Sequence, residues 1–413
     1  PSTISYCTIS NARNAIAIEG SLSNVITHSI IRYNNAAILV ESSQGNTIAN
    51  NEIYENTDWG ISIRNGCQRI LVAGNTIYKI EGDAIVLGGG EIGRQLFNID
   101  IKVRDNSINN NYYAGINASF TEAMEITSNT IYYNWKSPPP QRGAQARALL
   151  PFYYGGNIKL NGTLTSPVKD VLIHNNRIHS AAQNGTGVFV GNATNVRITY
   201  NDIYLNEGTG VNATWGSSLC HVFGNNIRNN CLVKQKWRAW EQAWDGGTSN
   251  YWDDGSRGNY WSAYNGTEKS WLGYNGTDAN NDGIGDIPFE LGPPKYSKDN
   301  FPLVNPLLLS MTTTSTSATS TRMATLTSFL SSTTKTDTSV TLATITSYAT
   351  WTSYTWTFKT TSTVMVYSIL PTSTTTTLTT SSTSTYSTTT SSTSSVTTTV
   401  TTTLTVATTP GRC

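Results

Sequence analysis

Apolar residues recur between residues 1 and 232 with a spacing that fits neither an amphipathic helix nor a single long strand. An isoleucine returns every 22 to 25 residues, with longer gaps before Ile108 and Ile178. A β-branched residue stands five positions earlier in every repeat, and a second apolar pair follows most of them. The recurring isoleucines are Ile9, Ile31, Ile53, Ile77, Ile108, Ile131, Ile178, Ile203 and Ile227. This pattern predicts short strands stacked coil upon coil.

Asparagine stands two positions before the recurring isoleucine in seven of the nine repeats, while the first two carry Cys7 and Ser29 there. The seven are Asn51, Asn75, Asn106, Asn129, Asn176, Asn201 and Asn225. At a bend between strands, an asparagine amide can hydrogen-bond the asparagines of neighbouring coils, and asparagine tolerates left-handed backbone. Such a short coil cannot bury its own apolar face, so we expect an all-β solenoid of about nine coils over residues 1–232.

The frame of Asn-x-Ile, then a second Asn, then Gly-Ile-x-Ile resembles the right-handed parallel β-helices of the NosD-like, carbohydrate-binding and sugar-hydrolase (CASH) group. The likeness continues in residues 250–255, 258–262, 282–286 and 299–303, which are similar to the terminal segment of archaeal members. It covers residues 1 to about 306. The resemblance implies a right-handed helix and an archaeal type of surface protein with a Trp-rich, calcium-loop terminal segment.

Two further regions follow the solenoid. Residues 233–309 are rich in tryptophan and are expected to cap the exposed end of the solenoid, although the tryptophans could instead offer stacking platforms for sugars. Residues 310–413 are dominated by Thr and Ser and are expected to form an O-glycosylated stalk or an assembly segment. Apolar residues at every third position from Leu342 to Tyr354 suit a polyproline-like helix, and the period of two after Tyr354 suits a strand.

Two insertions interrupt the repeat, at residues 88–98 and 134–157. Loops of this kind either wall a binding groove or elaborate the surface without a function.

Charge argues against two classes of partner. Only 13% of the residues are charged and the net charge is +1, so no nucleic-acid partner and no anionic membrane surface is expected. No apolar run is long enough to span a bilayer. The chain opens on Pro1, which indicates either a removed leader or a start inside a longer protein.

Seven Asn-x-Ser/Thr sequons predict N-linked glycans and an extracellular or cell-surface location. They are Asn117, Asn161, Asn184, Asn192, Asn212, Asn265 and Asn275. The five cysteines lack the spacing of a metal or redox site; Cys220 and Cys231 could pair or stay reduced, and Cys413 is the candidate for a free or intermolecular thiol.

One loop follows the frame of a calcium site, and we expect a structural calcium ion there, with a metal-free turn as the alternative. The twelfth position is Phe289 where an EF-hand has Glu, so the loop is closer to dockerin and thrombospondin-type repeats. The ligands would be the side chains of Asp278, Asn280, Asp282 and Asp286 and the backbone carbonyl of Ile284.

No catalytic residues are assigned from the sequence, and the chain is not expected to be an enzyme. A β-helix glycosidase needs paired carboxylates, and the polygalacturonase pattern needs an Asp pair and Gly-His-Gly, whereas Gly82-Asp83-Ala84 has a single Asp. The four histidines fall in different columns and are expected to be surface or packing residues.

The residue after the recurring isoleucine should point outward because side chains alternate along a strand. Four tyrosines in this column could bind a polysaccharide lying along the rod, or could stack on each other to stabilise the coils. They are Tyr54, Tyr78, Tyr132 and Tyr204.

The leading hypothesis is therefore a non-catalytic, extracellular structural or adhesive protein that self-associates into a filament or surface layer. One alternative is a carbohydrate-active lyase or hydrolase with a groove beside residues 134–157, for which Asp58, Asp83 and Asp202 are the residues to test. Another is a soluble polysaccharide-binding module.

Overall fold

The computed structural model divides the chain into two compact units, Pro1–Ser315 and Thr316–Cys413. The structure describes residues 1–88, 96–135, 155–231, 242–264, 277–291 and 297–309, together with six strands between residues 339 and 405. All of the regular structure in these residues is β.

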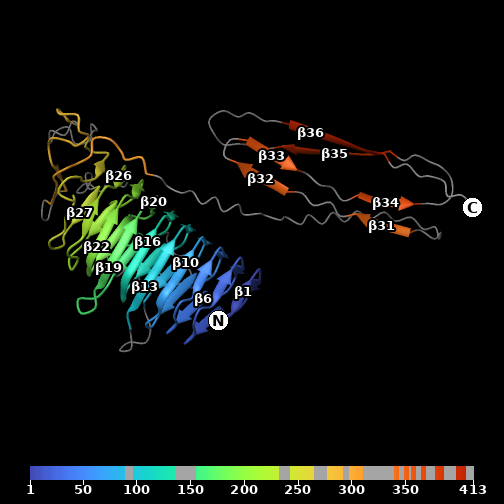
Figure 1. The fold of residues 1–413 in the computed structure, drawn as a ribbon, viewed down its shortest axis with the longest axis horizontal. Coiled ribbons are helices and arrows are strands. Elements are labelled where there is room, and N and C mark those ends of the chain that lie inside the picture. Colours follow the sequence, from blue (N-terminus) through green and yellow to red (C-terminus); the bar gives the residue numbers. More distant parts are fainter. Residues whose placement is uncertain are drawn as a thin grey trace, which may run out of the picture. The chain divides into compact units, whose positions relative to one another are not determined.

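The first unit is a parallel β-helix in which each coil gives one strand to each of three sheets (Figure 1). Sheet A contains β1 (Thr3–Ser5), β4 (Val25–Thr27), β7 (Thr47–Ala49), β10 (Gln68–Ala73), β13 (Asn98–Arg104), β16 (Thr121–Thr127), β19 (Val168–His174), β22 (Ala193–Thr199) and β25 (His221–Phe223). Sheet B contains β2 (Thr8–Ser10), β5 (Ile30–Arg32), β8 (Glu52–Tyr54), β11 (Thr76–Tyr78), β14 (Ser107–Asn109), β17 (Thr130–Tyr132), β20 (Arg177–His179), β23 (Asp202–Tyr204), β26 (Asn226–Arg228) and β28 (Tyr260–Trp261). Sheet C contains β3 (Asn14–Glu19), β6 (Ala36–Glu41), β9 (Ile61–Arg64), β12 (Ile85–Leu87), β15 (Ile116–Ala118), β18 (Gly156–Asn161), β21 (Thr186–Gly191), β24 (Val211–Ala213) and β27 (Ala243–Asp245).

The core lies between the three sheets and consists of the predicted apolar columns. From the second coil onward, every recurring isoleucine is fully buried. Each pairs in register with the isoleucine of the next coil, as Ile53 does with Ile77, except the last, Ile227, which pairs with Trp261. The apolar pair of sheet C is buried in the same way, as Ile85 and Leu87 show. The predicted solenoid and its repeat are confirmed, because stacking gives each coil the apolar partner it cannot supply alone.

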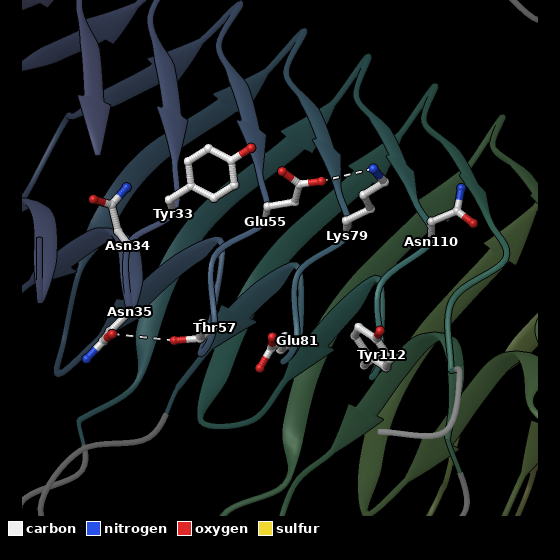
Figure 2. Close-up of a pocket in the computed structure, with 9 residues that line it drawn as sticks. All are labelled: Tyr33, Asn34, Asn35, Glu55, Thr57, Lys79, Glu81, Asn110 and Tyr112. Atoms are coloured by element: carbon white, nitrogen blue, oxygen red, sulfur yellow. Dashed lines mark hydrogen bonds and ion pairs between the residues drawn. The ribbon is translucent and has the colours of Figure 1, made fainter. Parts of the chain in front are cut away.

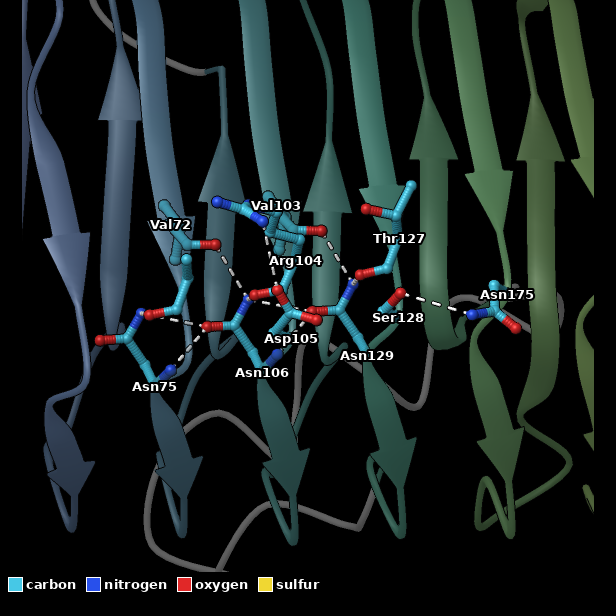
Figure 3. A network of polar contacts seen from close by, with 11 residues as sticks. Val72, Asn75, Val103, Arg104, Asp105, Asn106, Thr127, Ser128, Asn129 and Asn175 are labelled. Atoms are coloured by element: carbon cyan, nitrogen blue, oxygen red, sulfur yellow. Dashed lines mark hydrogen bonds and ion pairs between the residues drawn. The ribbon is translucent and has the colours of Figure 1, made fainter. Parts of the chain in front are cut away.

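The corner between sheets A and B holds the predicted asparagine ladder, part of which Figure 3 shows as Asn75, Asn106 and Asn129 in a row. Asn106 Oδ1 accepts from the backbone N–H of Asn75 at 2.9 Å and from its side-chain amide at 3.0 Å. Asn106 Nδ2 donates to the Val72 carbonyl, the Arg104 carbonyl and Asn129 Oδ1. The buried amides therefore satisfy the backbone groups that the bend takes out of the sheets.

The ladder asparagine was expected to be the residue with left-handed backbone at this corner, and that expectation is wrong. Positive φ belongs to the residue before the ladder asparagine: Asn50 at 56°, Asp105 at 57° and Ser128 at 56°. The ladder side chain is thus needed for its hydrogen bonds, while its neighbour absorbs the strained backbone.

A second asparagine ladder, not predicted, lies at the corner between sheets B and C. Its members are Asn34, Asn56, Asn111, Asn134, Asn206 and Asn230. One coil has Ala181 at this position, and Asn157 of β18 fills the gap: it accepts from Asn134 at 2.9 Å and donates to Asn206 at 3.2 Å. Both edges of sheet B are thereby tied to the neighbouring coils.

The helix extends beyond the predicted boundary at residue 232. Strand β27 continues sheet C and β28 continues sheet B, both in parallel register. Trp252 and Trp261 are buried at this end, and Trp261 stacks on Phe289 with ring centroids 4.5 Å apart. These two tryptophans pack in the cap, whereas Trp237, Trp240 and Trp271 lie outside the described residues.

Two buried aspartates fix the cap through the indole N–H groups. Asp245 accepts from Trp252 Nε1 at 3.0 Å and from Ser297 Oγ at 2.7 Å. Asp299 accepts from Trp261 Nε1 at 2.8 Å and from the backbone N–H of Asn259 at 2.7 Å. Asp299 itself lies on β30 (Lys298–Asp299), which pairs antiparallel with β29 (Phe289–Glu290).

The second unit contains antiparallel strand pairs in its described parts. These are β31 (Ser339–Ala343) with β34 (Val364–Ser368), β32 (Tyr348–Thr352) with β33 (Thr355–Lys359), and β35 (Thr377–Thr385) with β36 (Thr397–Thr405). The strand expected after Tyr354 is confirmed by β33. The polyproline-like helix expected between residues 342 and 354 is wrong over β31 and β32, because these residues pair through their backbones, which a polyproline helix leaves unpaired.

Candidate functional site

A groove with a volume of about 740 Å³ runs along the B-to-C corner over four coils (Figure 2). Two rows of side chains line it, each row taking one residue from each coil. The first row is Tyr33, Glu55, Lys79 and Asn110. The second row, two residues further along each coil, is Asn35, Thr57, Glu81 and Tyr112. The volume of the groove lies within the range of about 300–1,000 Å³ that is usual for ligand sites.

Backbone conformation explains the first row. All four residues have φ between 53° and 57°, so the chain turns sharply at the same place in each coil and turns these side chains outward. The residue types vary because the corner selects a backbone shape and not a side chain.

The charges of the groove are partly neutralised within it. Lys79 Nζ lies 2.9 Å from Glu55 Oε1, and the Tyr33 hydroxyl also donates to Glu55. These two hydrogen bonds, with Lys79 the larger influence, lower the pKa of Glu55. Glu81 has no side-chain hydrogen bond or ion pair to any described residue, so the lining residues carry two carboxylates and one ammonium. The Arg32 guanidinium lies beside Tyr33, with 5.2 Å to its ring centroid.

The predicted tyrosine column lies on the outer face of sheet B, and its rings stack on one another. Tyr54 and Tyr78 are face to face at 4.9 Å, and His179 is sandwiched between Tyr132 at 5.0 Å and Tyr204 at 4.6 Å. Burial in this stack lowers the pKa of His179 to about 4. The faces that a sugar would need are covered by neighbouring rings, which favours the packing alternative.

A second cluster of polar side chains lies on the outer face of sheet C, where it joins the corner. Asp83 Oδ1 accepts from the backbone N–H of Ala114 at 2.7 Å, and Asp83 Oδ2 accepts from Asn117 Nδ2 at 2.9 Å. Asn117 is in register with Lys159 on the next strand, and the Asp83 carboxylate acts on the Lys159 ammonium through its charge. Three side chains from three coils thus meet on one face.

Lys159 is half-buried in this cluster, unlike a typical surface lysine. Its neighbour in register on the other side is Phe189, which is only 5% exposed. Burial lowers the pKa of Lys159, even though the nearby Asp83 carboxylate acts in the opposite direction. A lysine of this kind holds its proton more weakly than a fully solvated lysine does.

The other candidates for acid–base chemistry have structural roles. Asp202 forms a double hydrogen bond with Arg228, at 2.9 and 2.8 Å. The four histidines each contact an aromatic ring, as in the stacked pairs His28–Tyr6 and His221–Tyr251, which agrees with a packing role. Asp58 lies at the turn before sheet C, where its backbone carbonyl closely approaches Gly82.

The predicted calcium loop is held by carboxylates that accept backbone N–H groups. Asp278 accepts from Asp282 at 3.1 Å and from Gly283 at 2.9 Å, Asp282 from Ile284 at 2.8 Å, and Asp286 from Ala279 at 2.9 Å. Gly283 has φ of 85°, as the sharp turn requires. Across the described ranges, no three His, Cys, Asp or Glu side chains gather as a metal site would need. A calcium ion here stays a prediction.

One predicted glycosylation site, Asn212, is buried in the structure. Asn212 is 5% exposed and lies in register between Phe189 and Trp244, so a glycan cannot be attached without opening this face. Asn161 and Asn184 are exposed, Asn117 and Asn192 are half-buried, and Asn265 and Asn275 lie outside the described residues. Glycans at these positions stay predictions.

The proposed Cys220–Cys231 disulfide is not formed, because Cys220 is a buried free thiol in the core. Burial raises the pKa of this thiol to about 12. Cys413 lies outside the described residues.

Sequence reasoning missed Lys159 and both rows of the corner groove. Lys159 stands between the apolar residues Ile158 and Leu160, so its outward position could be read from the alternation, but its burial could not. The groove residues share a conformation and not a residue type, which leaves no signal in a single sequence.

Comparisons with known proteins identify the fold. The family described as "Right handed beta helix region" matches residues 2–131 and 98–232, more than half of the chain. None of the curated proteins compared with the chain matches it. Within the described residues, no helix is long and apolar enough to cross a membrane.

Several solved structures share this architecture at low identity. The Azotobacter vinelandii mannuronan C-5 epimerase AlgE6 A-module is 15% identical, with 59% of this chain and 64% of that module covered and a TM-score of 0.41. An alginate lyase from a Paenibacillus species is 13% identical over 59% of this chain and 79% of that chain, with a TM-score of 0.38. A DFA-IIIase from Arthrobacter chlorophenolicus is 14% identical over 52% of this chain and 51% of that chain, with a TM-score of 0.34.

The expectations of a non-catalytic structural or adhesive protein and of a chain that is not an enzyme are corrected here. The three similar structures described above are an epimerase, a lyase and a DFA-IIIase, and none of them is an adhesive protein. At these identities the likeness concerns the fold alone, so any activity of this chain must be argued from its own side chains.

Proposed function

Because the chain belongs to the right-handed β-helix family, we propose that the helix carries a carbohydrate-active enzyme site on sheet C, built from Asp83, Asn117 and Lys159. The observation that carries the proposal is the convergence of these side chains on one face, with the lysine half-buried beside a carboxylate. A solvated surface lysine needs no such partner, whereas a lysine used for proton transfer needs both a fixed position and a lowered proton affinity.

The reaction that suits this set is β-elimination on a uronate-containing polysaccharide. The carboxylate of a uronic acid acidifies the hydrogen on the adjacent carbon, and the neutral Lys159 amine takes that proton. The electron pair of the broken carbon–hydrogen bond forms a carbon–carbon double bond, and the bond between the next carbon and the glycosidic oxygen breaks. That oxygen takes a proton from water as it leaves. Asn117, held by Asp83, has a second amide hydrogen with which to bind the substrate carboxylate.

A direct experiment is to incubate the full chain with polygalacturonate and with alginate and to follow the ultraviolet absorbance of the unsaturated product. Lys159→Met should lower the rate at least about 100-fold, as removal of a general base does. Asp83→Asn should also lower it, because the amide no longer orients Asn117 as the carboxylate does. The matched control is Lys102→Met, since Lys102 lies on sheet A and pairs with Glu125 at 3.3 Å.

Two results would count against this function. One is that neither acidic polysaccharide yields an unsaturated product. The other is that Lys159→Met and Lys102→Met keep equal rates. Melting temperatures of all variants must be compared, so that a loss of activity is not mistaken for a loss of fold.

We also propose that the chain is an exported, glycan-bearing member of the NosD-like group of archaeal type. The support is the order of the cap motifs and the density of sequons, of which Asn161 and Asn184 are exposed. Mass spectrometry of protein isolated from its native cells would test it through glycopeptides at these two asparagines. Unmodified peptides at both would contradict it.

A further inference from the structure

The corner groove of Figure 2 is separate in chemistry from the sheet C cluster and has features of a binding site in its own right. It spans four coils, and because stacked strands are about 4.8 Å apart, the first and fourth coils are roughly 14 Å apart. It is therefore long along the helix axis, which suits a chain-like ligand better than a compact one.

Tyr112 differs from the tyrosines of the sheet B column. Its side chain is half-buried, lines the groove at its fourth coil, and has no ring partner within the described residues. Tyr54, Tyr78 and Tyr132, in contrast, each have a ring face covered by a neighbour. The other tyrosine that lines the groove, Tyr33, has the Arg32 guanidinium 5.2 Å from its ring centroid and the Tyr54 ring at 6.3 Å. Tyr112 is thus the groove-lining ring better able to accept the apolar face of a sugar.

The polar lining suits hydroxyl groups. Thr57 and Asn35 form only a long hydrogen bond of 3.5 Å with each other, so both can take additional partners. Glu81 can accept from two hydroxyls, because it has no side-chain partner among the described residues. These three lie in the same row as Tyr112, so the row presents acceptors and donors beside a stacking surface.

Charge selects among saccharides. Lys79 is paired with Glu55, and the Arg32 guanidinium lies beside Tyr33 at the first coil of the groove, whereas Glu81 adds an unpaired carboxylate next to Tyr112. The Tyr112 end of the groove therefore repels a polyuronate. We propose that the corner groove binds an uncharged oligosaccharide that lies along the helix axis, stacked on Tyr112 and hydrogen-bonded by Glu81 and Thr57. This inference does not rest on the lyase activity proposed above.

The test is saturation-transfer NMR and calorimetry on the full chain with cellohexaose, maltohexaose, mannohexaose and xylohexaose, and with hexagalacturonate as the acidic probe. At least one neutral probe should bind, and Tyr112→Ala should weaken it at least about tenfold. Tyr132→Ala is the matched control and should leave the affinity unchanged, since that ring stacks on His179 outside the groove. Glu81→Gln should strengthen the binding of hexagalacturonate by removing the repulsive charge.

The proposal is overturned if no neutral probe binds, if Tyr112→Ala binds as well as the unmodified chain, or if hexagalacturonate binds more tightly than every neutral probe. Lys159→Met should not change binding in this groove. Failure of the lyase proposal and failure of this one are therefore separate results.

Discussion

At the scale of the residue, the ladder asparagines carry the corners of the helix. A ladder side chain is buried and uses both its oxygen and its nitrogen, so it replaces backbone partners that the bend removes from the sheets. No other side chain this short offers both an acceptor oxygen and two N–H donors. Aspartate has the same length, but it offers only acceptors when ionised and would add a buried charge.

We predict that Asn106→Ala lowers the free energy of unfolding by about 3 kcal/mol, because it leaves the Val72 carbonyl and the Asn75 N–H buried without their partner. Chemical denaturation of both proteins would measure the difference. Asn35→Ala, at an exposed position, is the control and should change stability by no more than about 0.5 kcal/mol. Equal losses for the two variants would mean that the ladder does not carry the corner.

The Asp299 carboxyl makes the cap sensitive to pH. Burial raises the pKa of Asp299 to about 7, more than the hydrogen bonds from Asn259, Trp261 and Phe301 lower it. The Asp299 carboxyl has a lower pKa in the unfolded chain than in the folded protein. Between about pH 4 and pH 7 the folded protein therefore keeps this carboxyl protonated more than the unfolded chain does. Stability from this group is greatest at low pH and is lost as the pH rises through about 7.

Denaturation midpoints at pH 5 and pH 8 would measure this effect, and Asp299→Asn should remove Asp299's share of the difference. If instead the Asp299 protein gains more stability than the asparagine variant on going from pH 5 to pH 8, the hydrogen bonds from Asn259, Trp261 and Phe301 outweigh burial and the carboxylate is the stable form.

The residue scale also shows what the sequence could tell. The first ladder was predicted because Asn recurs at one offset from the buried isoleucine. The second had a signal too, since Asn34, Asn56, Asn111, Asn134, Asn206 and Asn230 all stand three residues after that isoleucine. It was missed because Ile80 and Ala181 interrupt the column, and only the structure shows Asn157 filling the second gap.

At the scale of the element, the loop from residue 277 to 291 carries the calcium prediction. Its carboxylates converge on backbone N–H groups around Gly283, an arrangement that holds the loop in a tight turn. We expect a calcium ion to stabilise this turn further, because it binds the folded loop and not the unfolded one.

Chelation with EDTA should therefore lower the melting temperature of the first unit, and added calcium should restore it. Asp282→Ala should abolish that response. Asp254→Ala is the control, because Asp254 also accepts backbone N–H groups, from Ser256 and Arg257, but outside the calcium frame. An unchanged melting temperature with and without chelator would remove the calcium assignment and leave a metal-free turn.

Elements differ in how far a single sequence reveals them. The strands of the helix were predictable because alternation and burial repeat in every coil. The two candidate sites were not, because each departs from the repeat: Glu81 and Tyr112 share a row with Asn35 and Thr57, and Lys159 shares a column with Phe189. A search for repeats finds the residue types that recur at equivalent positions of the coils. The side chains of these two sites differ from those at the equivalent positions of other coils, so such a search does not find them.

At the scale of the whole first unit, each coil touches only the coils next to it, so stability should be a sum of coil terms and nearest-neighbour terms. The ladders make this testable, because Asn129 Oδ1 accepts from both the backbone N–H and the side-chain amide of Asn106, each at 2.9 Å. Asn106 and Asn201, in contrast, share no hydrogen bond and are separated by two coils.

We predict that Asn106→Ala and Asn201→Ala add within about 0.5 kcal/mol, as independent sites do. The double variant Asn106→Ala with Asn129→Ala should lose about 1 kcal/mol less stability than the two single variants added together. The hydrogen bond between the two side chains is lost in each single variant, but only once in the double variant. Denaturation of the three single and two double variants measures both couplings. Strong coupling of the distant pair would mean that the helix responds as one rigid body, and a change at Asn201 could then affect the corner groove and the sheet C cluster, which lie on earlier coils.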